Sequence, residues 1–439
     1  MDFRGPPVRV CVAGLWHLGS VTAASLAAGG HDVVGYDVDS QTTGRLGRAE
    51  PPILEPGLAE LVRRGIEAGM LRFSSDPAEA LLGADVVWIT YDTPVDEDDN
   101  ADVSHVARAV ESLFPHIPEG ALVLISSQLP VGSTRRLERA LAQSARGSRG
   151  ISFGYSPENL RLGKAIEVFT HPDRVLVGLR RHEDRERVER LLKPFTERIE
   201  WMSVESAEMT KHALNAFLAT SVAFINEIAT ICEHVGADAK EVERGLKSDK
   251  RIGPGAYLGP GGAFAGGTLA RDVVFLSNLG RNAGVPTNLI NGVKASNDAH
   301  RGWAGRRLRE ILGDLKGQRI AVWGLTYKPD TDTLRRSPAI ELCRSLVAQG
   351  ARVSAHDPVV KSLPEALAGV DLRDDALTAA KGAVALVVMT EWPEYKEIDA
   401  AAIAAVLSGD CIVLDANRFL ANRLANRDRI VYATVGKPL

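Results

Sequence analysis

The feature that most constrains the fold is an uninterrupted helical stretch in the middle of the chain. Residues 203–235 contain neither proline nor glycine, and Ser203 is suited to cap the start of a helix while Gly236 is suited to end it. At 1.5 Å per residue, such a helix is roughly 50 Å long. Helices of this length usually connect domains or build subunit interfaces, so we expect a helical middle between two other domains.

Strand-like and helix-like patterns alternate on both sides of this stretch. Short apolar strands are expected at 8–13, 85–90, 121–126 and 174–177, and again in QRIAVWGL, ARVSAHDP, AVALVVMT and CIVLDAN after Gln318. This alternation predicts parallel sheets covered by helices on both faces. The predicted fold class is therefore α/β, with two doubly wound Rossmann-like domains (1–200 and 303–439) joined by a helical central domain (201–302) that contains the long connecting helix.

Composition narrows the class of partner. The chain has 439 residues and a net charge of -4, which does not favour a nucleic acid or an anionic membrane as the main partner. We find no stretch that approaches the roughly 20 apolar residues of a membrane span. The four cysteines are far apart without a CxxC pair, and the N-terminus has no apolar signal region, so we expect reduced thiols and a cytoplasmic location. The ten histidines show no metal-ligand spacing, and no metal is predicted.

The first strand leads into a turn that partly matches a dinucleotide fingerprint. Gly14 and Gly19 occupy the first and third glycine positions of G-x-G-x-x-G, with Leu18 between them, but Trp16 stands where the second glycine lets a pyrophosphate approach the backbone. Asp37 ends the second strand, 23 positions after Gly14, where an acid binds ribose hydroxyls and disfavours a 2′-phosphate. The turn therefore favours NAD; the alternative is an ordinary βαβ turn with a surface aspartate.

Several segments resemble the UDP-glucose/GDP-mannose dehydrogenase family, and they occur in the family's order over nearly the whole chain. They are PPILEPGL (51–58), YDTPVDEDDNADVS (91–104), SSQLPVGST (126–134), SPENLRLGKAIEVFTHPDRVLVG (156–178), AEMTKHALNAFLATSVAFINE (207–227), SDKRIGPGAYLGPGGAFAGGTLARD (248–272) and GLTYKPDTDTLRRSP (324–338). The resemblance implies an NAD-binding N-terminal domain, a dimerising helical middle and a C-terminal domain that binds a nucleotide-sugar. It also implies oxidation of the sugar C6 alcohol.

The resemblance assigns catalytic roles to residues whose chemistry suits them. Lys211 and Asn215, four residues apart on one helix face, would bind the sugar's C6 oxygen, and an ammonium and an amide there would stabilise a developing oxyanion. Asp272 would assist proton removal with a water, and Glu158 would activate water during hydrolysis. Outside these motifs, such residues are more often solvated or structural.

Further residues match ligand-contacting positions of the family. Those expected on the substrate side are Leu160, Arg161, Arg251, Tyr257, Phe264, Gly266 and Lys328, together with Lys211 and Asn215. Those expected on the cofactor side are Gly14, Trp16, Leu18, Gly19, Asp37, Thr93, Pro94, Gln128 and Arg335. Basic side chains suit the diphosphate of a nucleotide-sugar. Arg251 is expected to reach the partner subunit of a homodimer.

The chain departs from the family pattern at the predicted centre of the reaction. Thr268 stands where the family has its nucleophilic cysteine, and a threonine hydroxyl is far less acidic than a thiol. Gln128 replaces a threonine, and Trp16 replaces a glycine. Three outcomes stay open: a single hydride transfer that gives an aldehyde or ketone, formation of the acid without a thiol, or loss of oxidation with only nucleotide-sugar binding. We rank oxidation of a UDP-hexose such as UDP-glucose first; a redox-neutral epimerase with retained NAD is a further alternative.

Overall fold

The chain folds into two compact units whose boundary falls between Ala213 and Leu214. The computed structural model describes residues 6–94, 101–158, 160–265, 267–425, 427 and 429–438. The segment ending at Ala213 is called unit 1, and the segment that begins at Leu214 is called unit 2. Helix α9 (Val204–Val235) contains the boundary, and it matches the long helix expected from the sequence. Ser203 Oγ accepts the Ser206 N–H at 3.2 Å, as a capping residue does, and Gly236 ends the helix with a φ of +82°.

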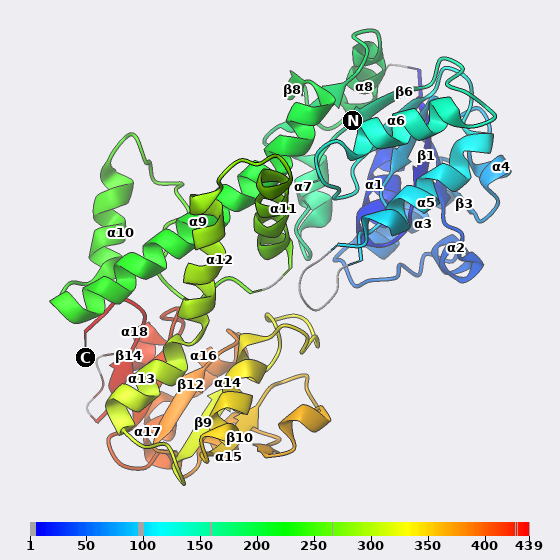
Figure 1. Cartoon of the computed structure of the whole chain (residues 1–439). Helices are drawn as coiled ribbons and strands as arrows, with labels where there is room; N and C mark the ends of the chain where they lie inside the picture. Colours follow the sequence, from blue (N-terminus) through cyan, green and yellow to red (C-terminus); the bar gives the residue numbers. More distant parts are fainter. Residues whose placement is uncertain are drawn as a thin grey trace. The chain divides into compact units, whose positions relative to one another are not determined.

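Unit 1 is built on one eight-stranded sheet in the order β3-β2-β1-β4-β5-β6-β7-β8 (Figure 1). Its strands are β1 (Arg9–Ala13), β2 (Asp32–Tyr36), β3 (Leu71–Ser74), β4 (Val86–Ile89), β5 (Leu122–Ile125), β6 (Ser152–Tyr155), β7 (Val175–Leu179) and β8 (Ile199–Met202). Its helices before α9 are α1 (His17–Ala28), α2 (Ser40–Gly47), α3 (Leu58–Glu67), α4 (Pro77–Ala80), α5 (Val103–Leu113), the 3-10 helix η1 (Phe114–His116), α6 (Ser133–Gln143), α7 (Ala165–Thr170) and α8 (Asp184–Leu192).

Helices cover both faces of this sheet, as the alternating pattern predicts. Val10 and Val12 of β1 belong to a core with α1, α3, α7 and α8. Cys11 and Ala13 of the same strand belong to the opposite core, with α5, α6 and the start of α9. Alternate side chains of one strand therefore enter two different cores, which explains why β1 reads as a continuous apolar run.

One strand pairing differs from the all-parallel sheet that the sequence pattern predicts. Strand β7 runs antiparallel to β6, with Tyr155 opposite Gly178 and Gly154 opposite Leu179. A parallel pair needs a crossover connection that returns the chain to the end of the sheet where the first strand began. The described residues 156–158 and 160–174, which include the short helix α7, instead connect the two strands at the carboxyl end of β6, so β7 starts at that same end. This loop carries Glu158.

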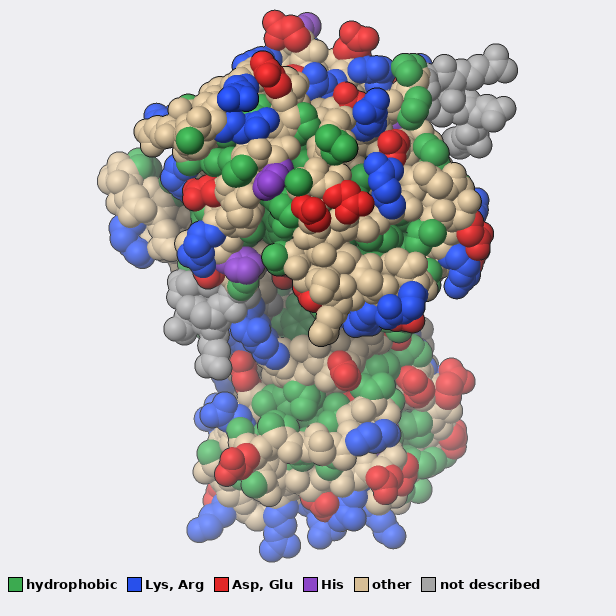
Figure 2. All heavy atoms as spheres, turned by 90° about the vertical axis from the view of Figure 1, so that its right-hand side faces the viewer, with side chains coloured by type: hydrophobic (Ala, Val, Ile, Leu, Met, Phe, Trp, Pro, Cys, Tyr) green, Lys and Arg blue, Asp and Glu red, His purple; other side chains and the backbone are tan. Residues whose placement is uncertain are grey.

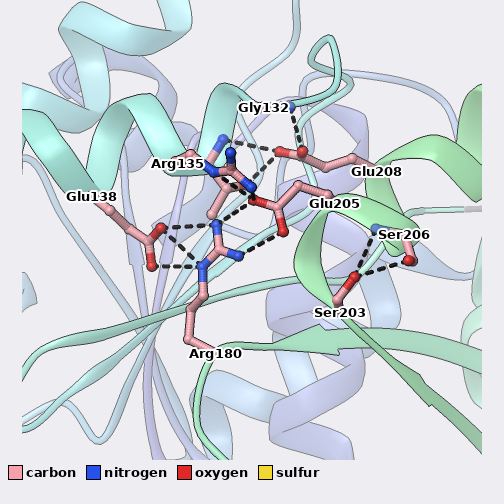
Figure 3. A network of polar contacts seen from close by, with 9 residues as sticks. Gly132, Arg135, Glu138, Arg180, Ser203, Glu205, Ser206 and Glu208 are labelled. Carbon is pink, nitrogen blue, oxygen red and sulfur yellow. Dashed lines mark hydrogen bonds and ion pairs between the residues drawn. The ribbon is translucent and has the colours of Figure 1, made fainter.

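The start of α9 is fixed to unit 1 by a network of charged groups (Figure 3). Arg180 lies between Glu138 of α6 and Glu205 of α9, with N–O distances of 2.9 and 2.7 Å. The hydrogen bonds from Arg180 lower the pKa of Glu205 to about 2. Glu208, fully buried, accepts the N–H groups of Gly132 and Thr134 at 2.6 and 2.9 Å. One turn of α9 therefore caps the first turn of α6.

Unit 2 is built on a six-stranded sheet in the order β11-β10-β9-β12-β13-β14, with all described pairs parallel (Figure 1). Its strands are β9 (Arg319–Trp323), β10 (Arg352–His356), β11 (Val370–Leu372), β12 (Ala385–Val388), β13 (Ile412–Asp415) and β14 (Val431–Ala433). Its helices besides α9 are α10 (Ala239–Ser248), α11 (Thr268–Asn282), α12 (Asn288–Arg301), α13 (Trp303–Leu312), α14 (Pro338–Ala348), η2 (Glu365–Leu367), α15 (Ala376–Ala380), α16 (Glu394–Glu397), α17 (Ala400–Val406) and α18 (Ala421–Leu424).

The second half of α9 belongs to the core of unit 2. Ala229 and Cys232 of α9 pack into the same core as Ile320 and Val322 of β9, with α13 and α14. Nearer the boundary, Ala216, Ala219 and Ala223 pack against α11 and α12. The four cysteines are free and buried, as the sequence predicts.

Contrary to the sequence-based expectation, α9 is long and apolar enough to cross a membrane, by length and composition alone. The helix is not apolar on all sides, because buried polar side chains on it form hydrogen bonds within each unit. His212 bonds the carbonyl of Leu129 in unit 1 at 2.9 Å, and Asn226 bonds Gly261 in unit 2 at 3.0 Å. Acidic and basic side chains both occur across the face shown in Figure 2.

Candidate active site

The turn after β1 has the two glycine geometries that a dinucleotide turn requires. Gly14 has a φ of +99°, and a Cβ there would lie 2.7 Å from the backbone nitrogen of Tyr91. A Cβ on Gly19 would lie 1.8 Å from the carbonyl oxygen of Gly14. The first glycine therefore makes the turn, and the third lets α1 pack against β1. The residues present fit an NAD site, because the turn leads directly into the N-terminus of α1.

Asp37 lies at the carboxyl end of β2 and faces the same turn. Its carboxylate accepts the N–H of Leu15 at 2.9 Å and the N–H of Asp39 at 3.0 Å. The side chain is only partly buried. Carboxylate lone pairs therefore remain for ribose hydroxyls, and the ribose-binding role of this residue stays a prediction.

Trp16 is the N-cap residue of α1 and leaves the turn's backbone geometry intact. Its φ of -78° suits any L-residue, and half of its surface, 50%, is exposed. Its side chain is thus not a core residue of unit 1. The next residue, His17, bonds the buried carboxylate of Glu55 at 3.0 Å, and Glu55 also accepts the N–H groups of Gly163 and Ala165.

The other predicted cofactor residues fall in two places. Thr93 is buried, and its hydroxyl donates to the carbonyl of Gln128 at 2.8 Å, which joins the loops after β4 and β5. Leu18 is partly buried in α1, and Pro94 is exposed at the edge of the described residues. Residues 95–100 of the predicted 91–104 motif lie outside the described residues. Arg335 is exposed in unit 2.

Lys211 and Glu158 come together in unit 1. The Lys211 ammonium donates to the carbonyl of Glu158 at 2.6 Å and lies 3.3 Å from its carboxylate. Glu158 Oε2 also accepts the N–H of Leu160 at 2.9 Å. Lys211 is 5% exposed, so this ammonium is held in a defined position rather than solvated. The structure therefore brings together two residues predicted to act on the sugar.

Asn215 and Asp272 come together in unit 2. Both are buried, and the Asn215 amide donates to the Asp272 carboxylate. Asp272 lies on α11, one turn after Thr268, which is the first residue of that helix and is exposed. Thr268 and Asp272 are thus four apart on one helix face. The position expected to carry a thiol is accessible but carries an alcohol.

The glycine-rich segment before α11 lines a cavity of about 330 Å³ in unit 2. Lys328 and Arg301 contribute cationic side chains to its wall, and Tyr327, Met389 and Asn417 contribute polar and apolar surface. Phe264 is partly buried against the α9–α11–α12 core. Gly266, also predicted to contact the substrate, lies outside the described residues. A mixed cavity with two cations suits a nucleoside diphosphate.

Three more predicted substrate residues stand at the surface. Arg161 is exposed in unit 1 beside the partly buried Leu160. In unit 2, Tyr257 is 57% exposed. The Arg251 guanidinium pairs with Asp249 at 2.7 Å. Within the described residues of each unit, these side chains extend toward solvent, which is compatible with the predicted role of Arg251 toward a second subunit.

Unit 2 contains a turn like the cofactor turn of unit 1, but the acid of this second turn is buried and hydrogen-bonded within the protein. Gly324, with a φ of +84°, donates to the carbonyl of His356 at 2.8 Å, just as Gly14 donates to Tyr36 at 2.9 Å. Asp357 then accepts the N–H of Leu325 at 2.7 Å, just as Asp37 accepts that of Leu15. Asp357, however, is 2% exposed and accepts further donors from Thr326, Val359 and Trp392. This second acid is therefore saturated by the protein itself.

Sequence reasoning missed several polar side chains that hold these segments in place. They are Glu55 and Glu208 in unit 1, and Asn226, Asn297, His300 and Asn417 in unit 2. Each binds backbone groups more than 30 residues away. Buried polar residues within apolar helices, such as Asn226 in α9, are the one signal that the sequence offers for them.

These features define a nicotinamide-dependent oxidoreductase: unit 1 has an NAD turn, and unit 2 has a paired amide and carboxylate as well as a cavity with cationic walls. The family descriptions agree. The NAD binding domain of the UDP-glucose/GDP-mannose dehydrogenase family matches residues 8–196, its central domain matches 205–299, and its UDP binding domain matches 321–422. The chain belongs to this family.

Relatives match along the whole length. A UDP-glucose 6-dehydrogenase of Pseudomonas aeruginosa is 35% identical over 450 residues, covering 98% of each chain. One from Bacillus subtilis is 32% identical, covering 98% of this chain and 93% of its own. Among solved structures, a UDP-glucose dehydrogenase from the archaeon Pyrobaculum islandicum is 30% identical with a TM-score of 0.85, covering 100% of both chains. The protein is thus an NAD-dependent nucleotide-sugar dehydrogenase.

Proposed function

We propose that the protein oxidises the C6 hydroxyl of a UDP-hexose such as UDP-glucose and stops after one two-electron step. The alcohol loses a hydride to NAD⁺ and a proton to the protein, which gives the 6-aldehyde, NADH and H⁺. The similarity to UDP-glucose 6-dehydrogenases supports the substrate and the carbon. The exposed Thr268 in place of a thiol supports the single step.

The protein's own groups suit the first oxidation. The buried Lys211 ammonium can stabilise negative charge on the C6 oxygen, and Asn215 can donate a hydrogen bond to it. Asp272, already bonded to Asn215, is the proposed proton acceptor, acting through a water. NAD⁺ supplies the hydride acceptor when bound. Burial strengthens each of these charge interactions.

The second oxidation is where the chain lacks a group. A thiol ionises near pH 8.5 and attacks an aldehyde as a thiolate, whereas an alcohol stays protonated without a strong base. The single observation that carries the proposal is that the Lys211–Glu158 and Asn215–Asp272 pairs are both retained, while a threonine occupies position 268.

The decisive experiment counts NADH per sugar. The purified protein is incubated with limiting UDP-glucose and excess NAD⁺, and the product is trapped with a hydrazine and identified by mass spectrometry. We expect one NADH per sugar and a trapped aldehyde. Two NADH with a carboxylate would contradict the single step. Nucleotide-sugar binding without NADH would favour the binding-protein alternative, and co-purified NADH without net oxidation would favour the epimerase alternative.

The variant Thr268→Cys tests the assigned position directly. We expect it to release a second NADH and form the carboxylate, because a thiol at this place can form a thiohemiacetal with the aldehyde. Thr268→Ser is the matched control and should keep the wild-type stoichiometry. An unchanged stoichiometry in Thr268→Cys, with intact first oxidation, would contradict the role proposed for this position.

We also propose that the protein is a homodimer and that it is cytoplasmic. Phe217, Phe224 and Ile231 recur every seven residues on α9 and are 70%, 46% and 55% exposed, which supports a helix face that a second copy covers. The free, buried cysteines support a reducing compartment. Subcellular fractionation of the native host would test the location, and recovery in the membrane or exported fraction would contradict it.

A further inference from the structure

The glycine-rich segment Gly261–Phe264 of unit 2 is held by side chains rather than by regular secondary structure. Glycine-rich loops lose much conformational entropy when they become ordered. A binding loop of this composition therefore often costs affinity, unless the protein orders it in advance. In unit 2, six backbone groups of this segment bond to four side chains from three places in the fold.

Asn297 of α12 binds both polar groups of one loop residue. Its Oδ1 accepts the N–H of Phe264 at 2.9 Å, and its Nδ2 donates to the carbonyl of Phe264 at 2.8 Å. The side chain is 4% exposed and comes from one turn before the end of its helix. A primary amide is suited to this task, because its donor and acceptor lie side by side.

Asn226 of α9 and His300 of α12 hold the two glycines of the segment. Asn226 accepts the N–H of Gly261 at 3.0 Å and donates to the carbonyl of Gly262 at 3.3 Å. His300 lies 2.8 Å from the carbonyl of Gly261 through Nε2. Burial lowers the pKa of His300, so the ring is neutral at neutral pH and its Nε2 carries the donated proton.

Asn417, just after β13, binds the segment to the α/β core. Its Oδ1 accepts the N–H of Gly262 at 2.7 Å. A Cβ on Gly261 would lie 2.3 Å from this oxygen, so a larger residue there would displace the Asn417 side chain from this contact. Gly262, Ala263, His300 and Asn417 also line the cavity with the cationic walls. The bonded segment is therefore a wall of the candidate binding site.

We propose that Asn226, Asn297, His300 and Asn417 are positioning residues that hold Gly261–Phe264 in its binding conformation before the nucleotide-sugar arrives. The inference rests on the proposed function, since the ligand is the UDP moiety of that substrate. Asn226 and Asn297 act through the loop backbone, whereas His300 and Asn417 also line the cavity themselves. Removing one of them should weaken nucleotide binding, because binding must then order the loop, and it should leave the rate at saturation nearly unchanged.

Hydrogen exchange tests the prior ordering. Exchange of the loop amides is followed by mass spectrometry in the full-length protein, with and without UDP. We expect slow exchange in the free wild type and little further slowing with UDP. In Asn297→Ala, exchange should be fast in the free protein and slow once UDP is bound. Fast exchange in the free wild type, slowed only by UDP, would overturn the proposal.

Affinity measurements complete the test. We expect the Kd of UDP, measured by titration calorimetry, to rise about tenfold in Asn297→Ala, with a less favourable entropy and an unchanged Kd for NAD. Asn291→Ala, on an exposed part of α12, is the matched control and should behave as wild type. Asn417 is exposed, so Asn417→Ala removes a contact to the same loop with little risk to folding, and its Kd for UDP is measured in the same way.

The two levels of the proposal fail in different ways. Absence of UDP binding to the wild type would contradict the proposed function, and this inference with it. Normal UDP binding in both Asn297→Ala and Asn417→Ala would overturn the inference alone. A rise in KM for UDP-glucose with an unchanged kcat supports positioning, whereas an equal loss of kcat would contradict it.

Discussion

Gly19 has the least room for substitution of the residues described at the cofactor turn. Because an added Cβ would lie 1.8 Å from the Gly14 carbonyl, backbone must move to accept it. We expect Gly19→Ala to lose NAD binding and to lower the free energy of unfolding by roughly 1–3 kcal/mol. Gly44→Ala, on the exposed face of α2, is the control and should keep NAD binding. NAD titration by fluorescence would check both, and normal binding by Gly19→Ala would contradict the assignment of the turn.

His31 makes the stability of unit 1 depend on pH. Its Nδ1 accepts the Val8 N–H at 3.3 Å, so its Nε2 must donate to the Leu191 carbonyl at 3.0 Å, and the ring is neutral. Burial lowers its pKa below the ordinary value of 6.5. Protonation therefore favours the unfolded state, so this contribution is complete above about pH 6.5 and declines as the pH falls below it.

Urea unfolding at several pH values checks this expectation. The free energy of unfolding should decline by up to about 1.4 kcal/mol per pH unit from this group below its unfolded pKa. His31→Gln should be less stable at pH 7.5 and should show a shallower decline in acid. An identical slope in wild type and variant would show that another group carries the acid sensitivity.

At the scale of elements, the first turns of α9 determine where Lys211 stands. Glu208 caps α6, His212 bonds the loop that precedes it, and Lys211 lies between these two anchors. Glu208→Ala leaves buried N–H groups without their acceptor, so we expect a loss of roughly 2–3 kcal/mol in the free energy of unfolding. Glu227→Ala, exposed on the same helix, should change it by less than about 0.5 kcal/mol. Thermal and chemical unfolding would measure both, and equal effects would contradict the capping role.

The elements also show how far the sequence could be interpreted. Helix α9 was predictable because it runs for 32 residues without proline or glycine, and β1 and β9 were predictable because each is a continuous apolar run that ends at a glycine turn. Strands β11 and β14 have three residues each, too short for a pattern. The direction of β7 depends on the end of the sheet at which the preceding loop places the start of the strand. No local sequence pattern predicts this.

The candidate site was predictable only in part, for a similar reason. The motifs assigned Lys211, Glu158, Asn215 and Asp272, and the structure adds which of them pair. The residues that hold the site, such as Asn297, act on backbone 33 positions away. Nothing in the local sequence distinguishes such an asparagine from a solvated one. The assigned ligand roles stay predictions until a complex is measured.

At the scale of the whole molecule, the exposed α9 face should decide the oligomeric state. We expect sedimentation to give a dimer for the wild type and a monomer for the double variant Phe217→Glu, Phe224→Glu, because two buried charges would oppose association. Leu289→Glu, exposed on α12, is the control and should remain a dimer. A monomeric wild type at micromolar concentration would contradict the proposed homodimer.

Asp357 of unit 2, whose carboxylate is fully hydrogen-bonded within the protein, bears on how one chain distinguishes two chemically similar ligands. NAD and a UDP-sugar both present ribose and a diphosphate, and both α/β units offer the same kind of turn. The Asp37 carboxylate has acceptor positions left for a sugar hydroxyl, whereas those of Asp357 are occupied by backbone N–H groups and the Trp392 indole. Excess NAD should therefore not act as a competitive inhibitor against the nucleotide-sugar. Likewise, a high concentration of the nucleotide-sugar should not displace NAD from its own site.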